Sequence, residues 1–241
     1  ITQVRAKQSV ISVIKSNTLS TIERLQLKIQ ASQRSLDALT AEAKSNRIET
    51  TTKRQEEYLV GLNIEGQRIA ILVDSSASMT ARELIKVTSY KVQSDAKRKS
   101  AAKWQRTLRI VQWLLARAPE DSELLVMSFS DNALIQSKPK WLSVKDKKAL
   151  AKTMQAVESV APYGATNLEH AINKVLKHSP DAIYLITDGL PTQGLGQASI
   201  LSSGGCGGIT SSKKTVSGEC RVTLLRRAAS LTNSFKGKLS I

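Results

Sequence analysis

Apolar positions along the chain change their spacing near residue 57, and this change divides the sequence into two segments. Upstream, they recur at alternating intervals of three and four, as at the a and d positions of a heptad repeat. The stripe runs through Ile22, Leu25, Ile29, Ser32, Leu36, Leu39, Ala43 and Asn46, with polar residues at two of these positions, Ser32 and Asn46. Because it is narrow, it favours a long helix that pairs with another helix, in this chain or in a second copy. One amphipathic helix packed on its own domain is the alternative. We therefore expect residues 1–57 to form a helical coiled-coil stalk.

Downstream, runs of consecutive apolar residues alternate with helical patterns. Strands are predicted at residues 58–64, 68–73, 124–129, 133–135, 182–188 and 238–241. Helices are predicted at about 104–118, 150–157, 168–177 and 222–231. The turn at Glu65 and Gly66 predicts that the first two strands form a hairpin. The alternation as a whole predicts an α/β, Rossmann-like, mostly parallel sheet with helices on both faces, over residues 58–241.

Small oxygen-bearing side chains lie at the ends of two of these strands. Asp74, Ser76 and Ser78 come after the apolar run 69–73, and Asp188 ends the predicted strand that begins at residue 182. Thr166 lies in a loop before a predicted helix. Ligands of such sheets bind beyond the carboxyl ends of the strands, and hard divalent cations prefer oxygen ligands. The serines could instead cap a helix, and Asp188 could belong to an ordinary turn. The three segments together favour a metal site.

The spacing Asp74-x-Ser76-x-Ser78, followed by Thr166 and Asp188, resembles the metal-ion-dependent adhesion site of von Willebrand factor type A domains. The resemblance implies that the three hydroxyls ligate Mg²⁺ and that the aspartates act directly or through water. Mn²⁺ and Ca²⁺ are alternatives. It also implies an open position for a carboxylate of a protein partner, and a bacterial envelope protein anchored upstream of this sequence, with a cytoplasmic location as the alternative.

Three features depart from that family. The segment between Ser78 and Trp104 and the loop after Asp188 are longer than usual. In addition, the last predicted element is the strand at residues 238–241, whereas the family would have a further helix and strand after it. In relatives with regulated affinity a final helix shifts when the site changes state. Because no such helix is predicted here, conformational switching is not predicted for this chain.

The charge of the chain favours acidic partners. The chain has 36 Lys and Arg residues and 20 Asp and Glu residues, which gives a net charge of +16. Residues 80–107 carry eight basic and two acidic residues close to the predicted site, so we expect an acidic protein surface as partner. Nucleic acid is the alternative, but aromatic residues make up only 4% of the chain, which is few for base stacking.

An enzyme is a weaker alternative, and a metal-dependent hydrolase would be the form of it to consider. A metal can activate water, but hydrolysis also needs a base. His170 and His178 are eight residues apart, which turns them about 80° from each other on a helix, and nothing directs them to the metal. Cys206 and Cys220 could form a disulfide across a loop or remain two thiols.

Overall fold

A computed structural model describes residues 62–194 and 216–241 of the chain. The predicted stalk at 1–57, and with it the division at residue 57, lies outside these residues, as does most of the loop after Asp188. The described residues form a six-stranded sheet in the order β3-β2-β1-β5-β6, with β4 paired to β2. Its strands are β1 (Arg68–Asp74), β2 (Glu123–Phe129), β3 (Ala133–Ile135), β4 (Leu142–Ser143), β5 (Ala182–Ile186) and β6 (Lys238–Ser240).

Strand β1 lies in the middle of the sheet and ends at the candidate site. It pairs in parallel with β2 on one side and with β5 on the other. Its last residue, Asp74, is opposite Phe129, the last residue of β2. Only β3 and β4, both paired to β2, run antiparallel. The predicted mostly parallel sheet is therefore confirmed, and the carboxyl ends of β1, β2 and β5 meet at one edge.

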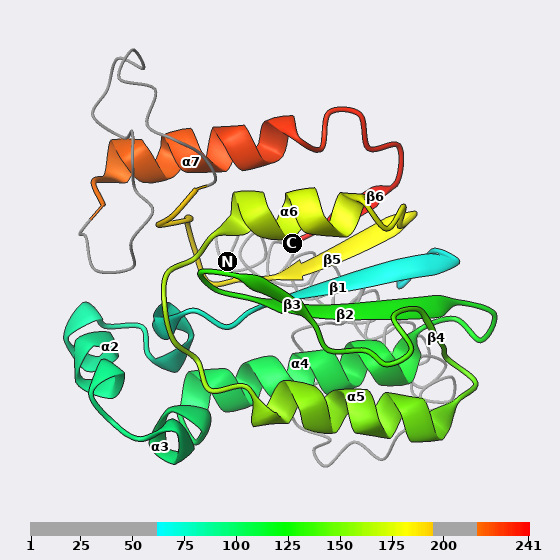
Figure 1. The fold of residues 1–241 in the computed structure, drawn as a ribbon, viewed down its shortest axis with the longest axis horizontal. Helices are drawn as coiled ribbons and strands as arrows, with labels where there is room; N and C mark the ends of the chain where they lie inside the picture. The colour runs from blue at the N-terminus through cyan, green and yellow to red at the C-terminus, as the bar shows by residue number, and fades with distance from the viewer. Residues whose placement is uncertain (1–61, 195–215) are drawn as a thin grey trace, which may run out of the picture. The chain divides into compact units, whose positions relative to one another are not determined.

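The helices cover both faces of this sheet (Figure 1). Helices α4 (Ala102–Arg117) and α5 (Lys147–Ser159) lie on one face, and α6 (Leu168–Leu176) and α7 (Gly218–Ser230) lie on the other. Two short helices, α2 (Leu84–Lys91) and α3 (Asp95–Lys99), and the 3-10 turn η3 (Ala77–Thr80) connect β1 to α4. The basic segment is therefore largely helical.

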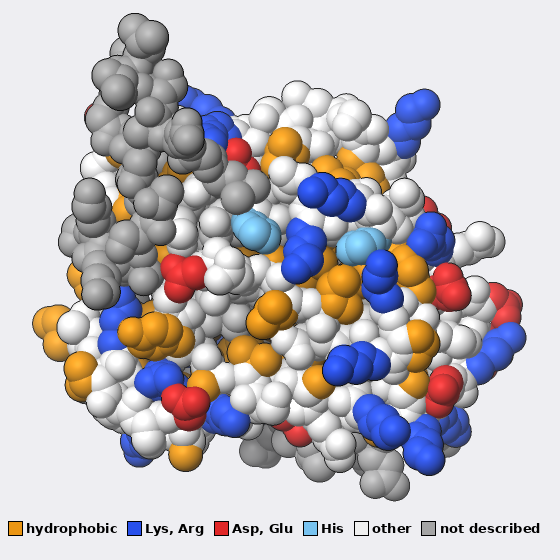
Figure 2. Space-filling model, in the orientation of Figure 1, with side chains coloured by type: hydrophobic (Ala, Val, Ile, Leu, Met, Phe, Trp, Pro, Cys, Tyr) orange, Lys and Arg blue, Asp and Glu red, His pale blue; other side chains and the backbone are white. Residues whose placement is uncertain are grey.

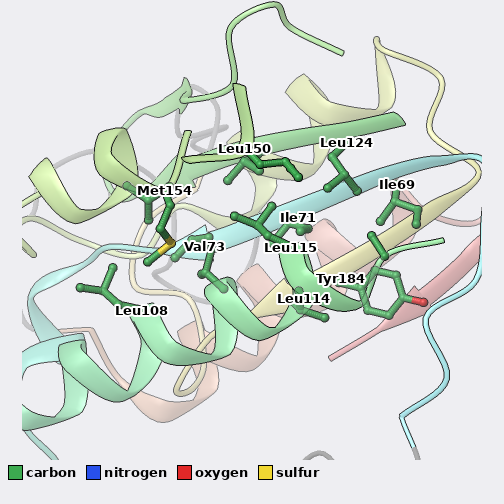
Figure 3. Packing of buried hydrophobic residues seen from close by; sticks show 14 of the residues in the cluster. Ile69, Ile71, Val73, Leu108, Leu114, Leu115, Leu124, Leu150, Met154 and Tyr184 are labelled. Carbon is green, nitrogen blue, oxygen red and sulfur yellow. The ribbon is translucent and has the colours of Figure 1, made fainter. Parts of the chain in front are cut away.

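Alternate residues of β1 belong to different hydrophobic clusters. Ile69, Ile71 and Val73 pack with α4 and α5 (Figure 3), and Ala70 and Leu72 pack with α6 and α7. Successive side chains of a strand point to opposite faces, so a strand buried on both faces must be apolar throughout. This explains why the run before Asp74 has no polar residue. Burial on both faces also makes β1 a rigid support for the loop that follows it.

The predicted hairpin is wrong in its described part. Residues 62–66 have no strand structure, and residues 58–61 lie outside the described part of the chain. Both edges of β1 are already paired with β2 and β5, so no edge remains for a hairpin partner. Ile64 is apolar because it packs into the core beside α4, and the backbone N–H of Glu65 donates to the Tyr184 hydroxyl at 2.9 Å.

Candidate functional site

The first loop of the site begins where β1 leaves the sheet. Ser75 is fixed to the end of β2, since its backbone N–H and its hydroxyl donate to the Phe129 carbonyl at 2.7 and 3.0 Å. Ser76 occupies the N-cap position of η3, yet its side chain makes no capping hydrogen bond. The helix-capping alternative for this serine is therefore wrong, and its hydroxyl points elsewhere.

The hydroxyl of Ser76 belongs to a continuous chain of oxygen atoms. Thr166 Oγ1 donates to Ser76 Oγ at 2.9 Å, and Ser76 Oγ lies 2.9 Å from Ser78 Oγ. Ser78 Oγ in turn donates to Asp188 Oδ1 at 2.9 Å. Three loops that are far apart in the sequence thus bring these four oxygen-bearing side chains together. The contact from Ser78 also shows that Asp188 does more than close a local turn.

Asp74 completes the set at its buried end. Its Oδ1 accepts from the backbone N–H of Ser76 at 2.8 Å, and its Oδ2 accepts from Thr187 Oγ1 at 2.8 Å. The pKa of Asp74 is raised to about 6, mainly because the carboxyl is buried. The hydrogen bonds from Ser76 and Thr187 lower this pKa, and the negative charge of Asp188 raises it. A buried carboxylate that is costly to ionise is well suited to a cation, which would stabilise the charged form.

The loop that presents Thr166 is held by several backbone contacts. The backbone N–H of Ala77 donates to the Gly164 carbonyl at 3.1 Å, and the Tyr163 N–H donates to Ser75 at 2.9 Å. Gly164 has a φ of +86°, and a Cβ there would lie 2.1 Å from Asp131 Oδ2. Glycine is therefore required at this position, both for its conformation and for space.

Exposure increases across the set, from its base to its rim. Asp74, Ser76 and Thr166 are buried, and Ser78 is half-buried. Asp188 is exposed as a whole residue, although its side chain keeps only 16% exposure because Ser78 and Lys103 cover the carboxylate. The set is therefore fully buried at its base, and its exposure rises toward Ser78 and Asp188.

The donor chemistry fits a hard divalent cation. The five residues supply three hydroxyls and two carboxylates, all oxygen donors of the kind that Mg²⁺ accepts. In residues 62–194 and 216–241 no group of three or more His, Cys, Asp or Glu could hold a metal. A metal here would consequently depend on the hydroxyl groups as well as on Asp74 and Asp188.

Lys103 also lies in the site, and the sequence did not single it out from the other basic residues. Its Nζ forms an ion pair with Asp188 Oδ2. It also donates to the carbonyls of Ser78 at 2.9 Å and Ala81 at 3.2 Å. Lys103 is the second residue of α4 and lies 85 residues from Asp188 in the sequence. No local pattern therefore connects the two.

The histidines and cysteines lie elsewhere in the described structure. His170 is in the first turn of α6, where its backbone N–H donates to the Asn167 side chain, and His178 follows that helix. Burial and nearby lysines lower the pKa of both histidines, on a face where Lys and Arg gather (Figure 2). Cys220, near the start of α7, is disulfide-bonded, and Cys206 lies outside the described residues.

Comparisons with known proteins agree with this fold. The family model of the von Willebrand factor type A domain matches residues 69–190, half of the chain. These residues include all five members of the set. A search of curated proteins found no significant match.

Three solved structures are similar at low sequence identity. The vWF domain of the type V pili tip protein Mfa5 from Porphyromonas gingivalis is 16% identical, with a TM-score of 0.35, over 56% of this chain and 41% of that one. The von Willebrand factor type A structure from Catenulispora acidiphila is 15% identical, with a TM-score of 0.39, over 70% and 32%. The PilB minor pilin from Streptococcus sanguinis is 18% identical, with a TM-score of 0.39, over 74% and 50%. This chain thus spans at most half of the length of each, and resemblance at this level transfers neither ligand nor partner.

Proposed function

The chain belongs to the von Willebrand factor type A domain family, and from this premise we propose that it is a non-enzymatic, metal-dependent protein-binding module. In this proposal Asp74, Ser76, Ser78, Thr166 and Asp188 form a metal-ion-dependent adhesion site for Mg²⁺. The observation that carries it is the chain of hydroxyl contacts from buried Thr166 to the rim at Asp188.

The roles of the residues follow from their positions. The buried Asp74 supplies negative charge at the base and orients Ser76 through that residue's backbone N–H. The hydroxyls of Ser76, Ser78 and Thr166 supply neutral oxygen donors, and the carboxylate of Asp188 supplies charge at the rim. A bound Mg²⁺ would keep one coordination position open for a carboxylate of the partner. Neutral donors would leave the metal strongly attractive to such a group, because they cancel little of its charge.

The surroundings of the site support a protein as the partner. On α2, which contacts η3, Leu84 is 75% exposed and Ile85 is 84% exposed. Tyr163, in the loop that leads to Thr166, is 52% exposed, and the Arg98 guanidinium lies 5.0 Å from its ring centre. Exposed large apolar side chains on elements of a site are typical of surfaces that contact another protein. With the basic residues of 80–107, this surface would suit a partner with an exposed Asp or Glu and apolar neighbours.

A metal-dependent hydrolase lacks comparable support. The hydrogen-bonded set contains no histidine or cysteine that could act as base or nucleophile. The excess of Lys and Arg could attract nucleic acid. A steep salt dependence of binding to generic DNA or RNA would reveal this. A cell-envelope location and an anchor upstream of Ile1 remain proposals from the sequence. No helix among the residues that the structure describes is both long enough and apolar enough to cross a membrane.

The test is capture of a partner from the native source in Mg²⁺ and in EDTA, with the wild type and the Asp74→Ala variant. A matched control is Asp121→Ala, since Asp121 is 88% exposed and precedes β2, at the opposite end of that strand from the site. The proposal predicts a partner that is retained by the wild type and the control in Mg²⁺. It also predicts that EDTA or Asp74→Ala abolishes this capture. A partner that stays bound in EDTA and to Asp74→Ala would place recognition elsewhere on the chain.

A further inference from the structure

The ammonium group of Lys103 holds three oxygen atoms at the rim of the site. Besides the carboxylate of Asp188, it contacts the carbonyl oxygens of Ser78 and Ala81. An ammonium has three protons and no acceptor, so these three contacts satisfy it. The side chains of Lys103 and Asp188 are only 23% and 16% exposed, which shields the pair from much of the solvent.

The backbone of α4 fixes the position of this ammonium. Ala101, the N-cap of α4, is buried, and Trp104, the residue after Lys103, is fully buried. The helix is therefore anchored in the core on either side of Lys103. The two carbonyls that accept from Lys103 belong to Ser78, inside η3, and to Ala81, the residue after η3. The Ser78 carbonyl also accepts from the Ala81 N–H at 3.3 Å. Lys103 thus ties α4, the loop after β1 and the loop after β5 together.

The contact with Asp188 places a positive charge beside a predicted metal ligand. One oxygen of Asp188, Oδ1, accepts from Ser78, and the other, Oδ2, is paired with Lys103. A divalent cation that uses Asp188 would therefore meet the ammonium as a competitor and as a like charge. At distances of a few ångströms in a partly shielded site, this repulsion amounts to more than the 1.4 kcal/mol that changes affinity tenfold.

We propose that Lys103 is an intrinsic competing cation that occupies Asp188 in the metal-free protein and weakens the affinity of the site for divalent ions. The inference rests on the proposed metal site and extends it to a residue outside the five-residue set. It assigns Lys103 two effects: stabilisation of the metal-free arrangement of the three loops, and a metal affinity lower than the same oxygen donors would otherwise give.

The experiment is calorimetric titration of the full chain with Mg²⁺ and with Mn²⁺, each as the chloride salt, for the wild type and Lys103→Met. Methionine keeps much of the length of lysine and removes the charge. Lys103→Gln removes the charge but keeps a donor, and it serves if the methionine variant does not fold. Lys103→Arg keeps the charge. The control is Lys97→Met, which makes the same change of charge at an exposed position of α3.

We expect Lys103→Met and Lys103→Gln to bind either metal about tenfold more tightly than the wild type. Lys103→Arg and Lys97→Met should stay within about twofold of the wild type. In EDTA, Lys103→Met should also melt about 3 °C lower than Lys97→Met, because it loses the ties to Asp188 and η3.

Two results would overturn the inference, and they differ in what they leave standing. If the wild type binds metal and Lys103→Met and Lys103→Gln bind it no more tightly, Lys103 does not compete and only this inference fails. If neither the wild type nor any Lys103 variant binds Mg²⁺ or Mn²⁺, the proposed metal site fails, and the competition fails with it.

Discussion

The hydroxyl of Ser78 donates a hydrogen bond of 2.9 Å to the carboxylate of Asp188, 110 residues later in the chain. It is the contact that closes the rim of the site, since it joins the loop after β1 to the loop after β5. Ser78 is also bonded to Ser76, which leads to buried Thr166. Direct hydrogen bonds therefore link the three loops through Thr166, Ser76, Ser78 and Asp188.

Removal of the Ser78 hydroxyl should weaken metal binding with little cost to the fold. Ser78→Ala removes one proposed ligand and the contact to Asp188 from a half-buried position. We expect the affinity for Mg²⁺ to fall at least about tenfold, by comparison with losses at other metal sites. The free energy of unfolding in EDTA should change by no more than about 1 kcal/mol. Calorimetry and urea unfolding check these two quantities.

The control for that experiment is Ser159→Ala. Ser159 is exposed at the end of α5, and its hydroxyl donates to the Ala156 carbonyl. This variant should bind Mg²⁺ as the wild type does. Equal affinities in Ser78→Ala and Ser159→Ala would exclude Ser78 from the ligand set.

Stability of the metal-free protein should depend on pH through Asp74. Burial raises the pKa of this carboxyl from 3.8 to about 6, so between these values the folded state binds the proton more tightly than the unfolded state does. The resulting stability is fully present below pH 3.8 and is lost as pH rises through about 6. In EDTA, the wild type should lose roughly 2 to 3 kcal/mol relative to Asp74→Asn between about pH 4 and about pH 7. Parallel urea-unfolding profiles of the two proteins across this range would contradict the expectation.

Gly164 should be intolerant of any side chain. Gly164→Ala places a Cβ at a φ of +86° and 2.1 Å from Asp131 Oδ2, so the threonine loop or the Asp131 carboxylate, which accepts from the Ala165 N–H of that loop, must move. We expect a loss of about 1 to 3 kcal/mol in the free energy of unfolding and weaker Mg²⁺ binding through displacement of Thr166. Gly189→Ala is the matched control, because no atom lies within 4 Å of its added Cβ. Equal melting temperatures for the two variants would count against the described loop.

The segment 1–57 is predicted to mediate assembly rather than metal binding. A chain that begins at residue 58 should have a lower oligomeric state in light scattering than the full chain, if the heptad stripe pairs with a second copy. Its affinity for Mg²⁺ should match that of the full chain, because all five proposed ligands lie downstream of residue 57. An unchanged oligomeric state would argue against pairing between copies.

Local patterns were sufficient to predict most elements of the described fold. The apolar runs before Asp74 and Asp188 are β1 and β5, and the four-three spacing after Trp104 is α4. The hairpin prediction failed because an apolar run reports burial and does not report which strand edge is already paired. Ile64 is buried by packing, without strand pairing. The sequence predicts a stripe in α7 made of Val222, Leu225, Ala228 and Leu231. Of these, Ala228 is buried and Leu225 and Leu231 pack against the core, but Val222 is 36% exposed, and Leu224 is buried instead.

The candidate site was only partly accessible from the sequence. Asp74, Ser76, Ser78 and Asp188 could be grouped from the sequence because they lie at the ends of strands that meet at one edge. Thr166 lies between two helices, and only the family motif connected it to the others. Lys103 could not, because it is one of eight basic residues between positions 80 and 107 and its relation to Asp188 arises only when α4 packs beside η3. Thr187 was also missed as a partner of Asp74. Its position next to Asp188 was a signal that could have found it.

The most direct measurement is titration of the purified wild type with Mg²⁺, with Asp188→Ala and Asp121→Ala in parallel. Asp188 supplies charge at the rim, whereas Asp121 lies at the opposite end of β2 in an exposed ion pair with Lys145. We predict saturable binding of one Mg²⁺ per chain to the wild type and to Asp121→Ala, and no detectable binding to a folded Asp188→Ala. Binding that is equal in all three proteins, or absent from the wild type, would contradict the proposed metal site.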